Sequence, residues 1–260
     1  MAAFWRITVL TAVAFAIAGI AWWLPPLPQP EAYHAFAETR TWLGIPHFTD
    51  VVSNLVFLLV GALGLGWLLR NRHRLGVIFV HRVESLPYAV LFVATIGIAV
   101  GSGYYHWDPD HLRLYWDRLA MTVAFMSLAA TIIGERLHYR LGLIALPILV
   151  LLGMGAATHW LFTELGGAGD LRPYLLTQVV PLVAGALLIL LYRSPYTRGG
   201  DFIAAGGWYL LALVAQNLDR EIHEFTAGWI SGHTLKHLLA GLAIYWIVRM
   251  LRLRKIRDRA

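Results

Sequence analysis

The chain has 260 residues, of which 58% are hydrophobic and only 14% are charged. Soluble domains carry about 25% charged residues, so this composition argues against a soluble protein and indicates a lipid bilayer as the solvent. The sequence contains no cysteine, which excludes disulfides, thiolate metal sites and cysteine nucleophiles together. Any metal ion must therefore be held by His, Asp or Glu side chains.

The apolar residues fall into eight runs, and most runs approach the roughly 20 residues that a spanning helix needs. The first run ends before Pro25-Pro26, and we predict a retained helix there. The alternative is a signal peptide cleaved near Ala35-Phe36-Ala37, although this site lies far beyond the run. The sequence thus predicts an all-α integral membrane helical bundle. The runs cover residues 7–24, 51–69, 86–102, 117–133, 141–160, 174–192, 202–217 and 233–251, of which 202–217 is short.

The basic residues separate between the two sides of the predicted bundle. The termini and the loops on one side carry 15 of the 21 Lys and Arg residues. The positive-inside rule places this side in the cytoplasm, so we predict a multi-pass protein with both termini cytoplasmic. The net charge of +6 is then a topology signal and not a sign of nucleic-acid binding. The six residues on the other side are Arg40, Arg113, Arg118, Arg172, Arg220 and Lys236.

Five polar residues converge on the non-cytoplasmic ends of three predicted helices. His233 and His237 open the last run one helical turn apart, a spacing that suits a transition metal. Ser102 and His106 repeat this spacing at the end of the third run, and Asp117 begins the fourth. Ionisable side chains in a membrane segment are unfavourable and mark functional sites. Their convergence therefore predicts a site at this end of the bundle.

Three His ligands with an open fourth position form a catalytic zinc arrangement, and zinc generates hydroxide near neutral pH. We predict Zn²⁺ held by His106, His233 and His237. Asp117 could transfer the proton of the attacking water, and Ser102 could hydrogen-bond the oxyanion of a tetrahedral intermediate. These parts fit hydrolysis of an acyl bond, amide or ester. Each residue also has a structural interpretation. Ser102 could hydrogen-bond a backbone carbonyl of its own helix, His106 could anchor its helix at the lipid headgroups, and Asp117 could cap its helix.

The remaining polar residues have ordinary interpretations. His111 and the acidic residues before it are expected to decorate a solvated loop. Asp219 belongs to an acidic turn, for which solvation is the default and cation binding the alternative. Ser53 and Asn54 begin the second run, where they could form hydrogen bonds between helices or support the metal ligands.

These residues resemble the alkaline ceramidase family and its wider CREST superfamily of membrane hydrolases. The resemblance rests on Ser102-x-x-x-His106, Asp117, His233-x-x-x-His237 and the segment Val52-Ser53-Asn54-Leu55. It implies a seven-helix ceramidase-like core plus one extra N-terminal helix. Residues 1–47 would form that helix and a Pro-rich external connection, residues 48–253 the catalytic bundle, and residues 254–260 a basic cytoplasmic tail.

The resemblance also implies a zinc-dependent amidohydrolase that splits ceramide-like lipids into a sphingoid base and a fatty acid. His106, His233 and His237 would hold the zinc, with Asp117 and Ser102 as catalytic residues, towards the non-cytoplasmic side. The chain differs from the family before residue 48, where a calcium-binding acidic segment is replaced by a Pro-rich one. The expected partners are a lipid amide and the membrane, with no nucleic acid.

Two other function classes remain open. One is a non-catalytic membrane receptor or sensor with a structural zinc site, in which Asp117 completes the coordination. The other is a transporter or channel with His and Asp along its pathway. A transporter predicts polar residues through the membrane depth, whereas those of this chain gather at one end.

Overall fold

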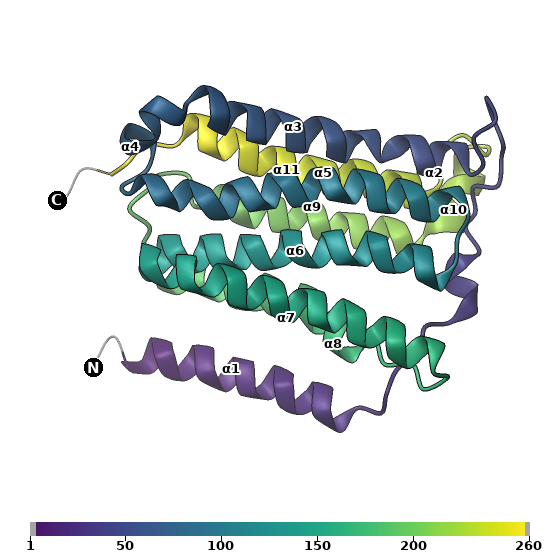
Figure 1. Cartoon of the computed structure of the whole chain (residues 1–260), viewed down its shortest axis with the longest axis horizontal. Coiled ribbons are helices and arrows are strands. Elements are labelled where there is room, and N and C mark those ends of the chain that lie inside the picture. Colours follow the sequence, from purple (N-terminus) through teal and green to yellow (C-terminus); the bar gives the residue numbers. More distant parts are fainter. Residues whose placement is uncertain (1–3, 258–260) are drawn as a thin grey trace.

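The computed structural model describes residues 4–257, so the first three residues and the last three residues of the predicted basic tail lie outside it. Within this range the chain is all-α, with no β-strand. Eight long helices lie side by side and alternate in direction (Figure 1). They are α1 (Phe4–Trp23), α2 and α3 (Phe48–Ser53 and Leu55–Arg70, in line), α5 (Ser85–Trp107), α6 (His111–Arg136), α7 (Tyr139–Leu165), α8 (Arg172–Leu191), α9 (Gly200–Asn217) and α11 (Gly232–Leu253).

Seven of these helices in the described range, all except α9, are long and apolar enough to cross a membrane. The predicted all-α membrane bundle is therefore confirmed. Helix α9 occupies the predicted short run and packs along α11, but Asp201, Gln216 and Asn217 make it less apolar. The connecting elements are η1 (Glu31–His34), η2 (Arg72–Arg74), α4 (Leu75–Ile78), η3 (Arg82–Glu84) and α10 (Asp219–Phe225).

Local chemistry explains why these runs form helices and where they are interrupted. Lipid offers no water to hydrogen-bond the backbone, so the N–H and C=O groups of a single apolar run must bond one another. An α-helix satisfies this requirement. The break between α2 and α3 falls at Asn54, whose side-chain amide donates to the Asp50 carbonyl oxygen at 2.8 Å. Prolines 147 and 181 lie inside α7 and α8 without ending them.

Helix α1 lies at the edge of the bundle and packs against α8 (Figure 1). The Arg172 guanidinium donates to the Leu24 carbonyl oxygen just beyond α1 and so satisfies a group that the helix end leaves open. Residues 25–47, which we call the strap, then cross the end of the bundle (Figure 1). The amide of Ala37 donates to Asp219 at 2.9 Å, and that of Gln29 donates to Glu164 at 2.9 Å.

The two ends of the bundle differ in character. Both ends of the described chain lie at one end, together with α4 and the connections α6–α7 and α8–α9 (Figure 1). Together with the two terminal segments, these connections carry most of the Lys and Arg residues. The strap and α10 lie at the opposite end, which we call the strap end. The predicted separation of basic residues therefore appears in the folded chain as a separation along the bundle axis.

Candidate metal centre

Three histidines from two helices meet inside the strap end. His106 lies in the last turn of α5, and His233 and His237 lie in the first turns of α11. All three are buried, and one ligating nitrogen of each lies within 4.8 Å of the others. The Nε2 atoms of His106 and His233 face each other at 3.1 Å. Helices that are far apart in the sequence thus build one compact group, as the alternation of the runs predicted.

A hydroxyl on α2 fixes the orientation of His237. Ser53 Oγ lies 2.7 Å from His237 Nδ1 and donates its own hydrogen to the Asp50 carbonyl oxygen at 3.0 Å. Nδ1 of His237 must therefore be the donor, which leaves the lone pair of Nε2 free for a metal ion. Outer partners of this kind commonly orient metal-bound histidines. Of the two interpretations of Ser53, support for the ligands fits this geometry, whereas Asn54 bonds its own helix.

Buried polar groups hold the start of α11 in place. The Ser231 side chain caps α11 by accepting a hydrogen bond from the Thr234 amide at 2.8 Å. The Asp50 carboxylate in turn accepts hydrogen bonds from the hydroxyl groups of Ser231 and Thr234. Asp219 accepts from the His233 amide at 2.8 Å. The expectation of a merely solvated Asp219 is therefore wrong, because its carboxylate ties α11 to the strap. Asp50 is fully buried, and only the three-dimensional arrangement reveals its contact with α11.

Ser102 and Asp117 meet where α5 and α6 pack most closely. A Cβ atom on Gly101 would lie 2.5 Å from the Trp116 carbonyl oxygen, so only glycine permits this approach. Ser102 and Asp117 are neighbours across this contact, and both side chains are buried. Asp117 does not belong to the group of mutually close ligand atoms. Asp117 and His237 line the same internal cavity.

One member of the histidine group, His237, lines a large apolar cavity inside the bundle. The cavity has a volume of about 580 Å³, and its polar lining residues are Ser102, Asp117, Lys236, His237, Gln178 and Tyr209. Apolar side chains of α3, α5, α6, α8, α9 and α11 form the rest of the lining. Ile203 and Leu210 line it and are 45% and 48% exposed, so the cavity reaches the outer surface of α9. Its size suits a small-molecule ligand.

Lys236 is a site residue that the sequence interpretation did not select. Its Nζ lies 3.4 Å from His233 Nε2, and its side chain lines the cavity. A sequence signal existed, because a lysine inside an apolar run one turn after a histidine is unusual. Its position places a positive charge beside the histidine group and facing any bound molecule.

The strap closes the site towards the end of the bundle. The Phe36 ring centroid lies 4.7 Å from that of His106 and 4.6 Å from that of His233. Glu38 is fully buried and bonds both Arg40 and Thr49, which fastens the strap beyond Phe36. A Pro-rich segment gave no sequence signal for this covering role, which depends on where the strap crosses the bundle.

A second group of ligating side chains joins the strap to the start of α6. Its members are Glu31, His34 and His111. His34 Nε2 lies 2.9 Å from His111 Nδ1, and His111 Nε2 lies 3.1 Å from Glu31. Burial and the neighbouring His111 lower the pKa of His34. The prediction that His111 decorates a solvated loop is therefore wrong, because it begins α6 and joins this hydrogen-bonded chain.

The three-histidine group fits a metal ion. Its donors are all imidazoles, which suit Zn, Cu, Fe and Ni, and two Nε2 atoms already face each other at 3.1 Å. No known protein family, curated protein or solved structure matches the chain. The chain is thus a multi-span membrane protein with a buried group, His106, His233 and His237, that could bind a metal ion.

Proposed function

We propose that this protein is a membrane-embedded zinc-dependent hydrolase that cleaves the N-acyl bond of ceramide-like lipids. One observation carries the proposal: His237 of the buried three-histidine group lines an apolar cavity that reaches the outer surface of the bundle. A lipid could place its hydrocarbon part in the cavity and its polar linkage against the histidines. The resemblance to alkaline ceramidases in the residues of the site supports an amide substrate. The positive-inside rule favours a site on the non-cytoplasmic side.

The chain supplies a residue for each part of such a hydrolysis. A zinc ion held by the three histidines would supply a nucleophilic water at neutral pH. Asp117 accepts the proton of the water that adds to the carbonyl carbon. It returns this proton to the nitrogen as the C–N bond breaks, giving an amine and a carboxylic acid. Ser102 and Lys236 face the cavity and would stabilise the negative charge that develops on the carbonyl oxygen.

The alternative is a receptor or sensor with a structural zinc site. Such a site is closed by four protein ligands. Asp117, the candidate fourth ligand, lies outside the group of mutually close ligand atoms, and His237 borders the cavity. Both observations support a site that is open to a bound lipid and therefore favour the hydrolase.

The test combines metal analysis with lipid mass spectrometry on purified, zinc-supplemented protein incubated with a mixed lipid extract. We expect about one zinc per chain and loss of amide lipids with release of fatty acid. His237→Ala should lose both the zinc and the activity. The matched control is His111→Ala, which removes a histidine from the second group and should retain both.

Two outcomes would contradict the proposal in different ways. Full zinc content in the His237→Ala variant would remove His237 from the metal site. Zinc that depends on His237, with no change in any amide or ester lipid, would instead support the receptor.

A further inference from the structure

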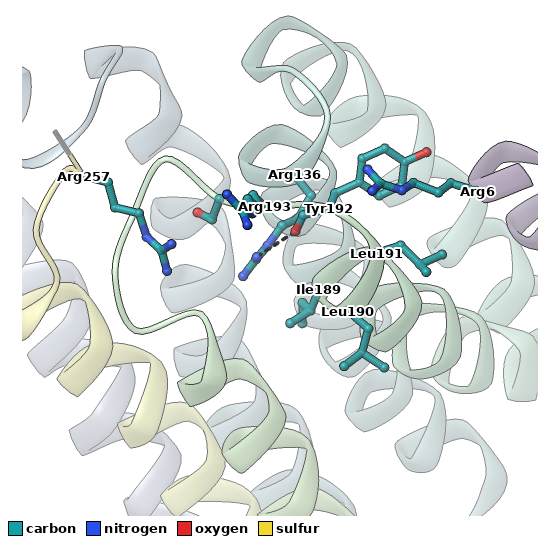
Figure 2. Close-up of a pocket in the computed structure, with 9 residues that line it drawn as sticks. Arg6, Arg136, Ile189, Leu190, Leu191, Tyr192, Arg193 and Arg257 are labelled. Atoms are coloured by element: carbon teal, nitrogen blue, oxygen red, sulfur yellow. Dashed lines mark hydrogen bonds between the residues drawn. The ribbon is translucent and has the colours of Figure 1, made fainter. Parts of the chain in front are cut away.

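A second cleft lies at the opposite end of the bundle, where α6 and α8 end (Figure 2). It has a volume of about 480 Å³ and is bordered by the start of α1, the α8–α9 connection and the C-terminal segment. No carboxylate among residues 4–257 lines it. Its lining contains four arginines, Arg6, Arg136, Arg193 and Arg257. Four cations without an acidic partner in the lining would repel one another unless an anion joins them.

Arg136 carries the strongest evidence. The residue is only 8% exposed, and its Nη1 donates to the Tyr192 carbonyl oxygen at 3.1 Å (Figure 2). Its Nε and Nη2 atoms are buried without a hydrogen-bond partner. A buried cationic group with free donors is strongly unfavourable. Gly199 leaves it room, because a Cβ atom there would lie 2.4 Å from Nη2.

The nearby acidic residues are already engaged elsewhere. Glu135 bonds Arg254 and the Tyr88 hydroxyl, and Asp201 pairs with Arg198 and Arg249. Neither of these carboxylates lines the cleft. Within the described residues, the free donors of Arg136 therefore have no internal acid to meet.

The other arginines extend the positive surface of the cleft. The Nε atom of Arg6 is also buried without a partner, and its guanidinium lies 5.5 Å from the centroid of the Tyr192 ring. Arg257 donates from Nε to the Tyr196 carbonyl oxygen at 3.1 Å, and Arg193 is exposed. Several donors in each planar guanidinium remain for a ligand.

We propose that this cleft binds a phosphate group. Guanidinium groups bind phosphate through paired, charge-assisted hydrogen bonds, and several arginines around one cleft favour an anion with several oxygens. The group could belong to a phospholipid headgroup or to a dissolved phosphate. The apolar edge favours the lipid, because Ile189, Leu190 and Leu191 line the same cleft and Leu190 is 74% exposed. This site lies at the other end of the bundle from the histidines and does not depend on the proposed hydrolase function.

The experiment measures the unfolding temperature of the purified full-length chain in detergent. The probes are dioleoyl phosphatidylglycerol, dioleoyl phosphatidylcholine and inorganic phosphate. Each is added to a separate sample, and the reference sample contains chloride at the same ionic strength. At a saturating concentration we expect phosphatidylglycerol to raise the unfolding temperature by about 5 °C. Phosphatidylcholine, whose headgroup carries no net charge, should give a clearly smaller shift.

Variants assign the effect to the cleft. Arg136→Gln should abolish the shift, and Arg193→Gln, at an exposed position that leaves the fold intact, should reduce it. Arg252→Gln is the matched control, since Arg252 is an exposed arginine at the same end that does not line the cleft.

The outcomes are distinct. A shift with phosphatidylglycerol alone supports a lipid headgroup, and an added shift with inorganic phosphate supports a dissolved phosphate, provided that the Arg136 and Arg193 variants weaken it. Equal shifts with both lipids would overturn the proposal. So would the absence of any shift, or a shift that persists in both variants.

Discussion

The strap end contains two groups of metal-ligating side chains, and they differ in how their ring nitrogens are satisfied. In the outer group, Glu31, His34 and His111 bond one another in a chain that also includes the Tyr105 hydroxyl. This group is complete without a metal ion, and Glu31 is 85% exposed. In the inner group, His106 and His233 face each other with like Nε2 atoms, and Ser53 fixes His237.

The difference shows that proximity alone does not identify a metal site. A hydrogen-bonded chain already satisfies the outer imidazoles, so a metal ion would have to break it. The inner imidazoles are buried among membrane helices, where an unsatisfied nitrogen is unfavourable and a metal ion would satisfy it. The inner group is therefore the one that we propose as the metal site.

The largest effect on turnover is expected from Asp117. Asp117→Asn keeps the size of the side chain but removes its ability to accept a proton. We expect bound zinc to remain and kcat to fall by about 10²–10⁴-fold. Glu31→Gln makes the same change in the outer group and should leave kcat unaltered. Near-normal turnover of the Asp117 variant, measured as fatty-acid release, would remove Asp117 from the mechanism.

A smaller loss is expected from Lys236→Met, which keeps the length of the side chain and removes its charge. If Lys236 stabilises the developing oxyanion, kcat should fall by about 10²-fold with zinc retained. Lys255→Met changes an exposed lysine at the other end of the bundle and serves as the control. Unchanged turnover with tighter zinc binding would show that Lys236 only repels the metal ion.

The contrast in hydrogen bonding predicts a further effect. Ser53→Ala removes the partner of His237 Nδ1 and should weaken zinc binding by about 10–100-fold. Tyr105→Phe removes the hydroxyl that contacts His34 in the outer group and should leave zinc affinity unchanged. Competition with a chromogenic chelator measures both values, and equal affinities in the two variants would contradict the assignment of the metal to the inner group.

The smallest effect concerns pH and the strap that carries Glu31 and His34. Burial alone raises the pKa of Glu38, but hydrogen bonds from Arg40 and Thr49 outweigh it and lower the pKa below its ordinary value of 4.5. The carboxylate therefore stabilises the strap above pH 4.5, and this contribution is lost as the pH falls further. Limited proteolysis should cut the strap faster at acidic pH. Glu38→Gln should remove this dependence, and an unchanged pH profile in that variant would contradict it.

The sequence predicts much of the site because membrane helices alternate in direction. That rule brings the end of one apolar run beside the start of another, so His106, His233 and His237 could be assigned to one end of the bundle from their positions alone. It also locates Ser102 and Asp117 near them. The rule does not describe the irregular strap, so the covering role of Phe36 and the chain of His34 and His111 escaped prediction.

The sequence by itself thus determined the solvent, the helical class, the number of apolar runs and the end at which the polar residues gather. These properties follow from the composition and length of the apolar runs and from the placement of charges between them, which can be read along the chain without knowledge of its contacts. Only the tertiary structure decided which nitrogen of His237 is free, how close α5 and α6 approach, and that His237 lines an apolar cavity. These properties depend on contacts between segments such as Ser53 and His237, which are 184 residues apart in the chain.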